Sequence, residues 1–381
     1  LVQAMTLLCR DEKLGPRIVP IVPDEARTFG MEGMFRQIGI YAHEGQKYEP
    51  VDREQLMYYR EDQKGQFLQE GINEDGAISS WIAAATSYSN SGIQMIPFYT
   101  FYSMFGFQRV GDLIWAAGDI QARGFLIGGT SGRTTLNGEG LQHEDGQSQI
   151  MAANVPNCIS YDPTFAYELM VIIQNGLKRM FENQENVFYY ITTLNENYPH
   201  PEMKKGQEEN IIKGMYLFQQ GGKGSKRVQL MGSGSILREV IAAANILSED
   251  FGIQADVWSC PSFNELKRDG DDCVRWNLMH PDQKPRIPHV TSCLEKHSGP
   301  VVAATDYVKL FADQIRAYVG RNYHVLGTDG FGRSDTRASL RRHFEVNRYY
   351  VTVAALKTLA DEGTIPAKTV KSAIRKYKLD P

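Results

Sequence analysis

The stretch Leu68-Gln-Glu-Gly-Ile-Asn-Glu-Asp-Gly76 is the part of the sequence from which we infer the fold. After an apolar entry we expect a sharp turn at Gly71, and a helical pattern begins directly behind it. Asn73 suits the N-cap, because its side chain can accept a hydrogen bond from a free backbone N–H of the first turn. Glu74 would then follow the end of a strand, where open α/β sheets bind ligands. An isolated Glu in such a position more often only complements the helix dipole.

Two neighbouring segments make a functional role for Glu74 the better hypothesis. Between Ile96 and Phe107 the sequence is rich in aromatic residues, and we expect a helix over 101–121. A helix buries only one stripe, so some of these aromatic side chains should face a cleft and suit a flat heteroaromatic ligand. The segment from Gly128 to Gly146 is rich in glycine and contains His143. His143 is either a solvated loop residue or a proton donor that works near neutral pH, and we favour the donor.

Composition limits the class of protein. The 381 residues, 42% of them hydrophobic, are enough for about two domains. A net charge of -4 gives no sign of a nucleic-acid surface. The five cysteines form no C-x-x-C pair, which argues against a zinc or redox motif and fits a reducing cytoplasm. We find neither a membrane-spanning apolar run nor a signal peptide. Because the sequence opens at Leu1 within an apolar pattern, we expect it to be part of a longer polypeptide.

Strands and helices alternate along the chain, which predicts two doubly wound α/β domains with parallel sheets. We place the boundary within a linker-like stretch over 195–226, with domains at 1–203 and 204–381. The prolines of the strand over 17–23 suggest a position near a sheet edge. Expected strands cover 17–23, 67–70, 93–99, 124–128, 157–161, 187–193, 227–231, 254–258, 300–305 and 323–326. Expected helices cover 77–88, 101–121, 149–155, 165–183, 235–248, 308–319, 349–360 and 367–378.

Three further motifs have simpler interpretations. Leu230–Leu237 begins like a dinucleotide fingerprint, but Leu237 takes the place of its third glycine, so we expect only a tight turn. Arg268–Asp272 lacks the spacing of a calcium loop and suggests a solvated turn. The polar, glycine-rich run Gly327–Arg337 either has a structural role or contacts a partner domain.

Six long runs carry a resemblance to a known family, namely Gln69–Glu74, Phe98–Arg109, Gly128–Gly146, Asn157–Pro163, Tyr189–Asn197 and Gly327–Asp335. They resemble the homodimeric bacterial pyruvate dehydrogenases, the decarboxylating first component of their complex. The resemblance covers essentially the whole chain and corresponds to the family's pyrimidine-binding and transketolase-like C-terminal domains. It implies that the domain that holds the diphosphate and magnesium is not in this chain.

The resemblance implies thiamine-diphosphate-dependent oxidative decarboxylation of pyruvate, with reductive acetylation of a lipoyl group on a dihydrolipoyl acetyltransferase core. It identifies Glu74 as the glutamate that activates the cofactor, a role that suits a buried carboxyl whose pKa is raised. It further implies that Ile72 is an apolar wedge that keeps the cofactor bent, and that Phe105 stacks on the pyrimidine. The other implied site residues are Tyr102 in the aromatic pocket, Asp24 and Glu25 as active-site acids, and His143 near the reaction centre.

One departure from the family concerns a second histidine. Related proteins carry histidines shortly after the equivalent of Asp145, whereas this sequence continues Gly146-Gln-Ser-Gln149. His143 is therefore expected to act as the single histidine acid of this segment. Two other interpretations stay open, namely a different thiamine-dependent transketolase or 2-oxo acid decarboxylase, and a non-catalytic assembly chain with the same fold.

Overall fold

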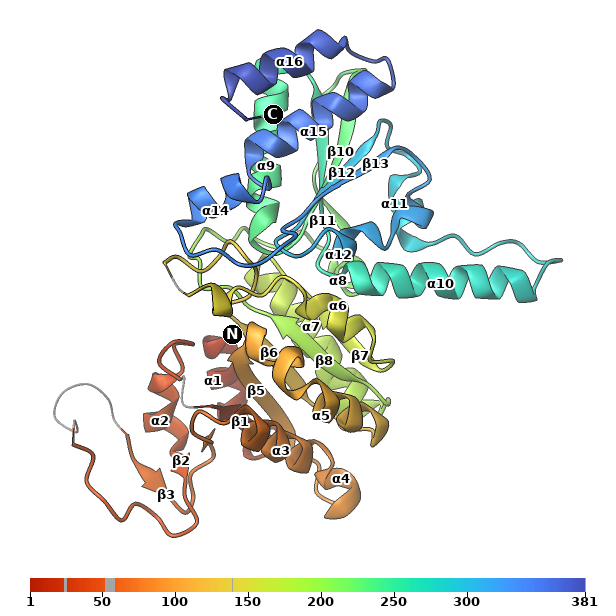
Figure 1. The fold of residues 1–381 in the computed structure, drawn as a ribbon. Coiled ribbons are helices and arrows are strands. Elements are labelled where there is room, and N and C mark those ends of the chain that lie inside the picture. The colour runs from red at the N-terminus through yellow and green to blue at the C-terminus, as the bar shows by residue number, and fades with distance from the viewer. Residues whose placement is uncertain (24–25, 52–58, 139, 381) are drawn as a thin grey trace. The chain divides into compact units, whose positions relative to one another are not determined.

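The computed structural model describes residues 1–23, 26–51, 59–138 and 140–380 (Figure 1). Contacts divide the chain into two compact units. The first unit comprises Leu1–Ser131, Met151–Ile159 and Ile173–Asn195. The second unit comprises Gly132–Ile150, Ser160–Ile172 and Glu196–Pro381. Among the described residues, no helix is both long and apolar enough to cross a membrane.

A six-stranded sheet forms the centre of the first unit, in the order β4-β1-β5-β6-β8-β7. Its strands are β1 (Ile18–Val22), β4 (Leu68–Gln69), β5 (Ile96–Tyr102), β6 (Phe125–Gly129), β7 (Cys158–Tyr161) and β8 (Phe188–Thr192). β1 pairs in parallel with β4 on one side and with β5 on the other. The expected position near a sheet edge is therefore confirmed, since only the two-residue strand β4 lies outside β1. All five β1 residues are buried, and this apolar burial favours an inner position although Pro20 can donate no ladder hydrogen bond.

The aromatic run after Ile96 is divided differently from the prediction. Tyr99, Phe101 and Tyr102 belong to β5, which pairs with β1 and β6, and a short 3-10 turn (Ser103–Phe105) follows. The helix α5 begins only at Phe107 and ends at Asp119. Side chains of a strand alternate between the two faces of the sheet, so the argument from a single helical stripe does not apply to these residues.

Helices and two short strands complete this part of the chain. β2 (Ile40–Tyr41) and β3 (Glu61–Asp62) form a separate parallel pair. The helices are α1 (Val2–Arg10), α2 (Glu32–Ile38), α3 (Glu74–Ala85), α4 (Ser87–Asn90), α6 (Ser148–Ala153) and α7 (Ala166–Leu177), which continues as a π turn over Lys178–Glu182.

The second unit contains a five-stranded sheet in the order β13-β12-β10-β11-β9. Its parallel strands β10 (Arg227–Gly232), β11 (Gln254–Ser259), β12 (Val301–Ala304) and β13 (Tyr323–Leu326) agree with the expected ones. β9 (Tyr216–Gln219) pairs antiparallel with β11, and α8 (Glu208–Ile212) precedes it. Both lie in the stretch expected to be a linker, because a four-residue edge strand is too short to stand out in a polar sequence.

Helices α9 (Leu237–Phe251), α15 (Arg348–Asp361) and α16 (Ala367–Lys376) contribute to one apolar core of this unit. On α9 the buried residues Val240, Ala243, Ala244 and Leu247 follow the helical repeat. The expected helix over 308–319 is two short ones, α12 (Leu310–Asp313) and α13 (Arg316–Val319). Two further short helices of this unit are α11 (His289–Leu294) and α14 (Arg337–His343).

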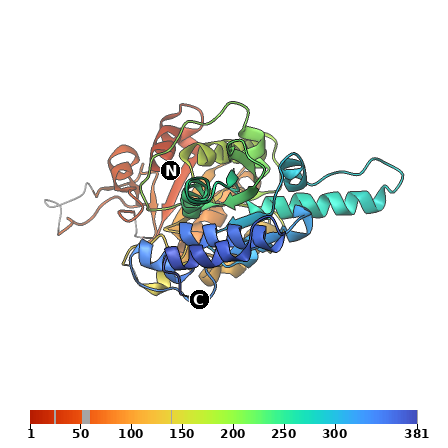
Figure 2. The same ribbon diagram turned by 90° about the horizontal axis from the view of Figure 1, so that it is seen from above.

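The acid-rich run Arg268–Asp272 lies inside α10 (Phe263–Met279), so its assignment to a turn was wrong. The side chain of Ser262 caps this helix by accepting a hydrogen bond from the backbone N–H of Glu265, 3.0 Å away. Two ion pairs between neighbouring turns, Arg268–Glu265 and Lys267–Asp271, stabilise it further. Both views show α10 running outward from the rest of the second unit (Figures 1 and 2).

Candidate active site

Glu74 has the local structure that the sequence predicts. β4 ends at Gln69, Gly71 turns with φ +73°, and α3 begins at Glu74. The Asn73 side chain accepts a hydrogen bond from the backbone N–H of Gly76 at 3.1 Å. Glu74 is only 9% exposed, although a carboxylate that merely complements a helix dipole can remain in water. The burial of Glu74 therefore favours a functional role.

The partner of Glu74 is Arg109, which the sequence analysis missed. A guanidinium nitrogen of Arg109 lies 2.9 Å from Oε1 of Glu74. The same guanidinium lies over the ring of Phe105, 4.0 Å from its centroid. A planar cationic group thus stacks on an aromatic ring and donates to a buried carboxylate. The spacing of four residues between Phe105 and Arg109 would have been a weak sequence signal for this stack.

Aromatic rings and the buried hydroxyl of Tyr99 lie near this pair within the first unit. The ring of Tyr102 meets that of Phe105 edge to face, with centroids 5.8 Å apart. Tyr99 is fully buried, and burial together with the nearby charges of Glu74 and Asp75 raises the pKa of its hydroxyl. Within the described part of the chain, the hydroxyls of Tyr99 and Ser103 are buried without a hydrogen-bond partner. Buried polar groups usually have partners, so these hydroxyls fit a site that receives a polar ligand.

The structure is less informative about the other residues implied for this site. Ile72 is 73% exposed at the turn before α3, so its apolar side chain is free to contact a ligand. Asp24 and Glu25 lie outside the described residues.

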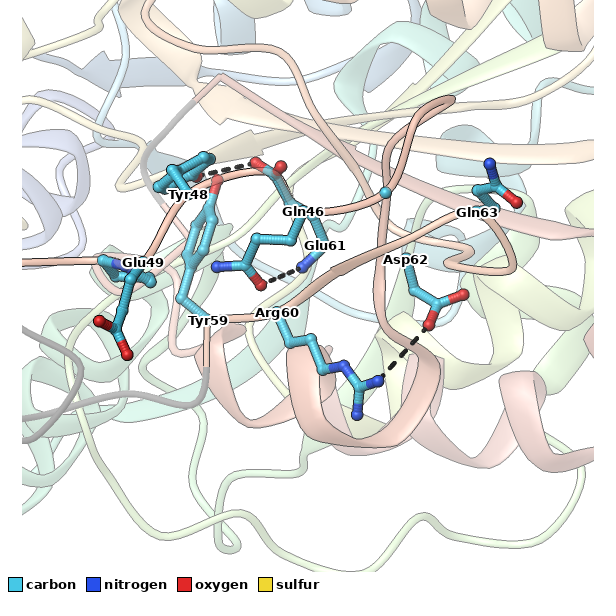
Figure 3. A pocket seen from close by; sticks show the side chains of 10 residues that line it. Gln46, Tyr48, Glu49, Tyr59, Arg60, Glu61, Asp62 and Gln63 are labelled. Atoms are coloured by element: carbon cyan, nitrogen blue, oxygen red, sulfur yellow. Dashed lines mark hydrogen bonds and ion pairs between the residues drawn. The ribbon is translucent and has the colours of Figure 1, made fainter.

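The first unit also contains a cavity of about 700 Å³ that is separate from these residues. It is lined by residues of the segments 45–50 and 59–63, and Figure 3 shows that its wall is mainly polar. The Tyr48 hydroxyl donates to Glu61 at 2.9 Å, and Arg60 lies 4.0 Å from Asp62. Because these groups already pair with each other, the cavity offers little free charge to a ligand.

His143 lies in the second unit, on a 3-10 turn formed by Leu141–His143, and is half-buried. This turn is not an unrestrained loop. The backbone N–H of Gly138 donates to the carbonyl of Asp335 at 3.1 Å, and the Arg337 side chain donates to the carbonyl of Thr135 at 2.6 Å. Two glycine-rich segments that are far apart in the sequence therefore hold each other in place.

Arg133 also links these two segments. Its guanidinium donates to the carbonyls of Thr328 and Gly330, the latter 197 positions away, and to Gln147. Burial lowers the pKa of Arg133, although the carboxylates around it act in the opposite direction. The run Gly327–Arg337, for which the sequence left two interpretations, thus has a structural role beside His143.

The segment 132–135 also covers the point where the strand order of the second sheet reverses, between β10 and β12. Asp306, fully buried just after β12, accepts hydrogen bonds from the Thr134 N–H at 3.1 Å and the hydroxyls of Thr135 and Ser235. Gly132 has φ +87°, and a Cβ there would lie 2.3 Å from Asp306. The chain's own residues therefore fill the place where such sheets bind ligands.

Asp145 and the residues that follow it have structural roles here. Asp145 accepts hydrogen bonds from the backbone N–H groups of Gln147 and Ser148, at the start of α6. Gln149 is fully buried and donates to the carbonyl of Tyr161 at 3.0 Å. The amide of Gln149 holds two backbone segments together, a task for which it does not need to titrate.

Comparison with known proteins identifies the family. The model of the pyruvate dehydrogenase E1 component middle domain matches residues 1–201, and that of the transketolase-like C-terminal domain matches residues 214–347. This chain belongs to the pyruvate dehydrogenase E1 component family. The family resemblance inferred from the sequence is confirmed, and so is the doubly wound α/β class.

Among its relatives, the pyruvate dehydrogenase E1 components of Pseudomonas aeruginosa and Cupriavidus necator are 64% and 63% identical to it over 382 residues. These alignments cover 100% of this chain and 43% of each relative, so the chain spans less than half of their length. Among solved structures, transketolase from Leishmania mexicana has the same fold, with a TM-score of 0.67 at 15% identity. That match covers 93% of this chain and 44% of the transketolase.

Proposed function

We propose that this chain forms the pyrimidine-binding and C-terminal part of a thiamine-diphosphate-dependent pyruvate dehydrogenase. The observation that carries the proposal is the burial of Glu74 at the start of α3, joined through one planar cation to the ring of Phe105. We further propose a homodimer that works in the cytoplasm with a dihydrolipoyl acetyltransferase core. The test is turnover: the intact enzyme should decarboxylate pyruvate in preference to 2-oxoglutarate or a ketose phosphate.

When bound, thiamine diphosphate supplies a carbon nucleophile and an electron sink for decarboxylation. The residues described above fit its pyrimidine half. Glu74 would hydrogen-bond to the ring and hold a proton there, and Phe105 would stack on one face. Ile72 would present an apolar surface, and Tyr99 and Ser103 would offer buried hydroxyls. His143 would donate a proton to the departing sulfur when a lipoyl group accepts the acetyl unit.

Arg109 must leave its position before a pyrimidine ring can occupy the same place. It stacks on Phe105 and donates to Glu74, the two interactions proposed for the ring, and its side chain is about half exposed. Arg109→Met removes this competitor and should make thiamine diphosphate bind roughly three- to tenfold more tightly, because less of the apo enzyme is closed. Calorimetric titration of the intact enzyme with cofactor and magnesium measures this change.

Arg109→Lys is the matched control, since it keeps the positive charge but loses the planar group that stacks on Phe105. Its affinity should lie between those of the wild type and Arg109→Met. Weaker binding by Arg109→Met would contradict the competitor role and assign Arg109 to the support of Glu74 in the bound enzyme.

The 381-residue chain by itself should bind thiamine diphosphate poorly and should not decarboxylate pyruvate. Its described residues contain no group of three His, Cys, Asp or Glu side chains suited to a metal ion. A diphosphate in these enzymes needs magnesium as an anchor, and magnesium prefers oxygen ligands. Calorimetry of the chain with cofactor and magnesium checks this expectation, and tight, magnesium-dependent binding would contradict it.

A further inference from the structure

Glu144 connects the turn of His143 to the run Gly327–Arg337. It ends the turn, its backbone N–H donating to the carbonyl of Leu141. Its side chain is 1% exposed, and Oε2 accepts a hydrogen bond from the backbone N–H of Arg333 at 2.6 Å. A Cβ on Gly332 would lie 2.7 Å from the carbonyl oxygen of Leu141 and 2.9 Å from Cβ of Glu144. The contact between the two segments therefore depends on glycine at position 332 and on the Glu144 carboxyl.

The carboxyl of Glu144 is only half satisfied. Within the described residues, its second oxygen, Oε1, is buried and has no hydrogen-bond partner. Such a group in a native structure calls for an explanation. If Glu144 only accepted the hydrogen bond from Arg333, a glutamine would serve equally well, because it offers an acceptor oxygen without a charge.

The surroundings of Glu144 set its protonation. Burial raises the pKa of Glu144 to about 7, the Arg333 N–H and the charge of Arg133 act to lower it, and the carboxylate of Asp306 raises it further. Asp145 and Asp329 face the same guanidinium of Arg133 from the neighbouring segments. Glu144 is thus a buried acid with few compensating charges, next to the histidine proposed as proton donor.

We propose that Glu144 is a positioning residue for His143, fixing the turn Leu141–His143 to the run Gly327–Arg337 while protonated and releasing it when ionised. The role of His143 in this statement rests on the proposed function. The release itself is a property of the second unit and can be measured without catalysis.

The sign of the pH effect follows from linkage. An opened turn exposes Glu144 to water, where its pKa returns to about 4.5, whereas the closed turn holds it at about 7. Below pH 4.5 Glu144 is protonated in both forms, so its full contribution to the closed turn is present. Between pH 4.5 and pH 7 the ratio of opened to closed turn should rise by up to about tenfold for each pH unit. Above pH 7 this ratio should change no further through Glu144.

Hydrogen exchange of the backbone amides of His143, Glu144 and Arg333 tests this proposal on the 381-residue chain. Their protection factors should fall at least about tenfold between pH 5 and pH 7 in the wild type. Glu144→Gln, which keeps an acceptor oxygen but cannot ionise, should abolish this pH dependence. Glu249→Gln changes an exposed carboxyl of α9 and should behave like the wild type. A pH dependence that persists in Glu144→Gln would overturn the proposal.

Two further measurements complete the test. The first uses only the wild type, so it does not require Glu144→Gln to fold, and the second separates this proposal from the proposed function. In the wild type, the Glu144 side-chain carboxyl signal in a carbon NMR titration should change near pH 7, and a change near 4.5 would overturn the proposal. In the intact enzyme, Glu144→Gln should widen the pH profile of acetyl transfer to lipoamide on its alkaline side, and an unchanged profile would separate Glu144 from His143. If the intact wild-type enzyme were completely inactive towards pyruvate, the proposed function would be rejected, whereas the result of the hydrogen-exchange experiment would still hold.

Discussion

Glu74→Ala should slow proton exchange at the thiazolium carbon of bound thiamine diphosphate by roughly 10²- to 10⁴-fold in the intact enzyme, the range typical of a lost acid–base group. The side chain is buried at the first residue of α3, and no other described carboxylate forms an ion pair with Arg109 there. In the proposed function Glu74 holds a proton on the pyrimidine, and Glu74→Ala would remove that group. Exchange is followed by NMR after a rapid transfer into deuterium oxide.

Asp75→Ala is the matched control for this result. Asp75 lies in the same first turn of α3 but is exposed, so it complements the helix dipole equally well without reaching the ring. It should leave the exchange rate near that of the wild type. Similar rates in wild type and Glu74→Ala would mean that Glu74 serves only the helix, and circular dichroism of both variants would show whether the fold is retained.

His143→Ala should slow acetyl transfer to lipoamide by roughly 10²-fold or more and slow pyruvate decarboxylation much less. An imidazolium can donate the proton that the departing sulfur needs, whereas an ionised carboxylate cannot. Decarboxylation is followed with an artificial electron acceptor, and transfer with a lipoyl domain as acceptor. The ratio of the two losses is the measured quantity.

Gln142→Ala provides the comparison for His143, since Gln142 is exposed in the same 3-10 turn and has no acid function. It should affect neither assay. Equal losses in both assays for His143→Ala would move His143 to cofactor or pyruvate binding. If neither assay changed, His143 would be a half-buried residue of the turn without a catalytic part.

The turn and the helix start around Glu74 could be predicted because they depend on a short window of sequence. Gly71 allows a positive φ, Asn73 caps the following helix, and Glu74 then has to occupy the first turn. β13 agrees with its predicted range for the same reason, since β-branched and aromatic residues between polar ends favour a strand. The family resemblance added the chemical roles, which no local pattern contains.

Only the tertiary structure decided which distant groups meet. The sheet order placed β1 between β4 and β5, next to the edge strand, with its whole apolar run buried. The ion pair of Arg109 with Glu74 and the contacts of Arg133 and Glu144 with the run Gly327–Arg337 join residues from separate elements. Propensity and periodicity act over one or two turns of chain, whereas these contacts depend on how strands are ordered and on which charges burial forces to pair.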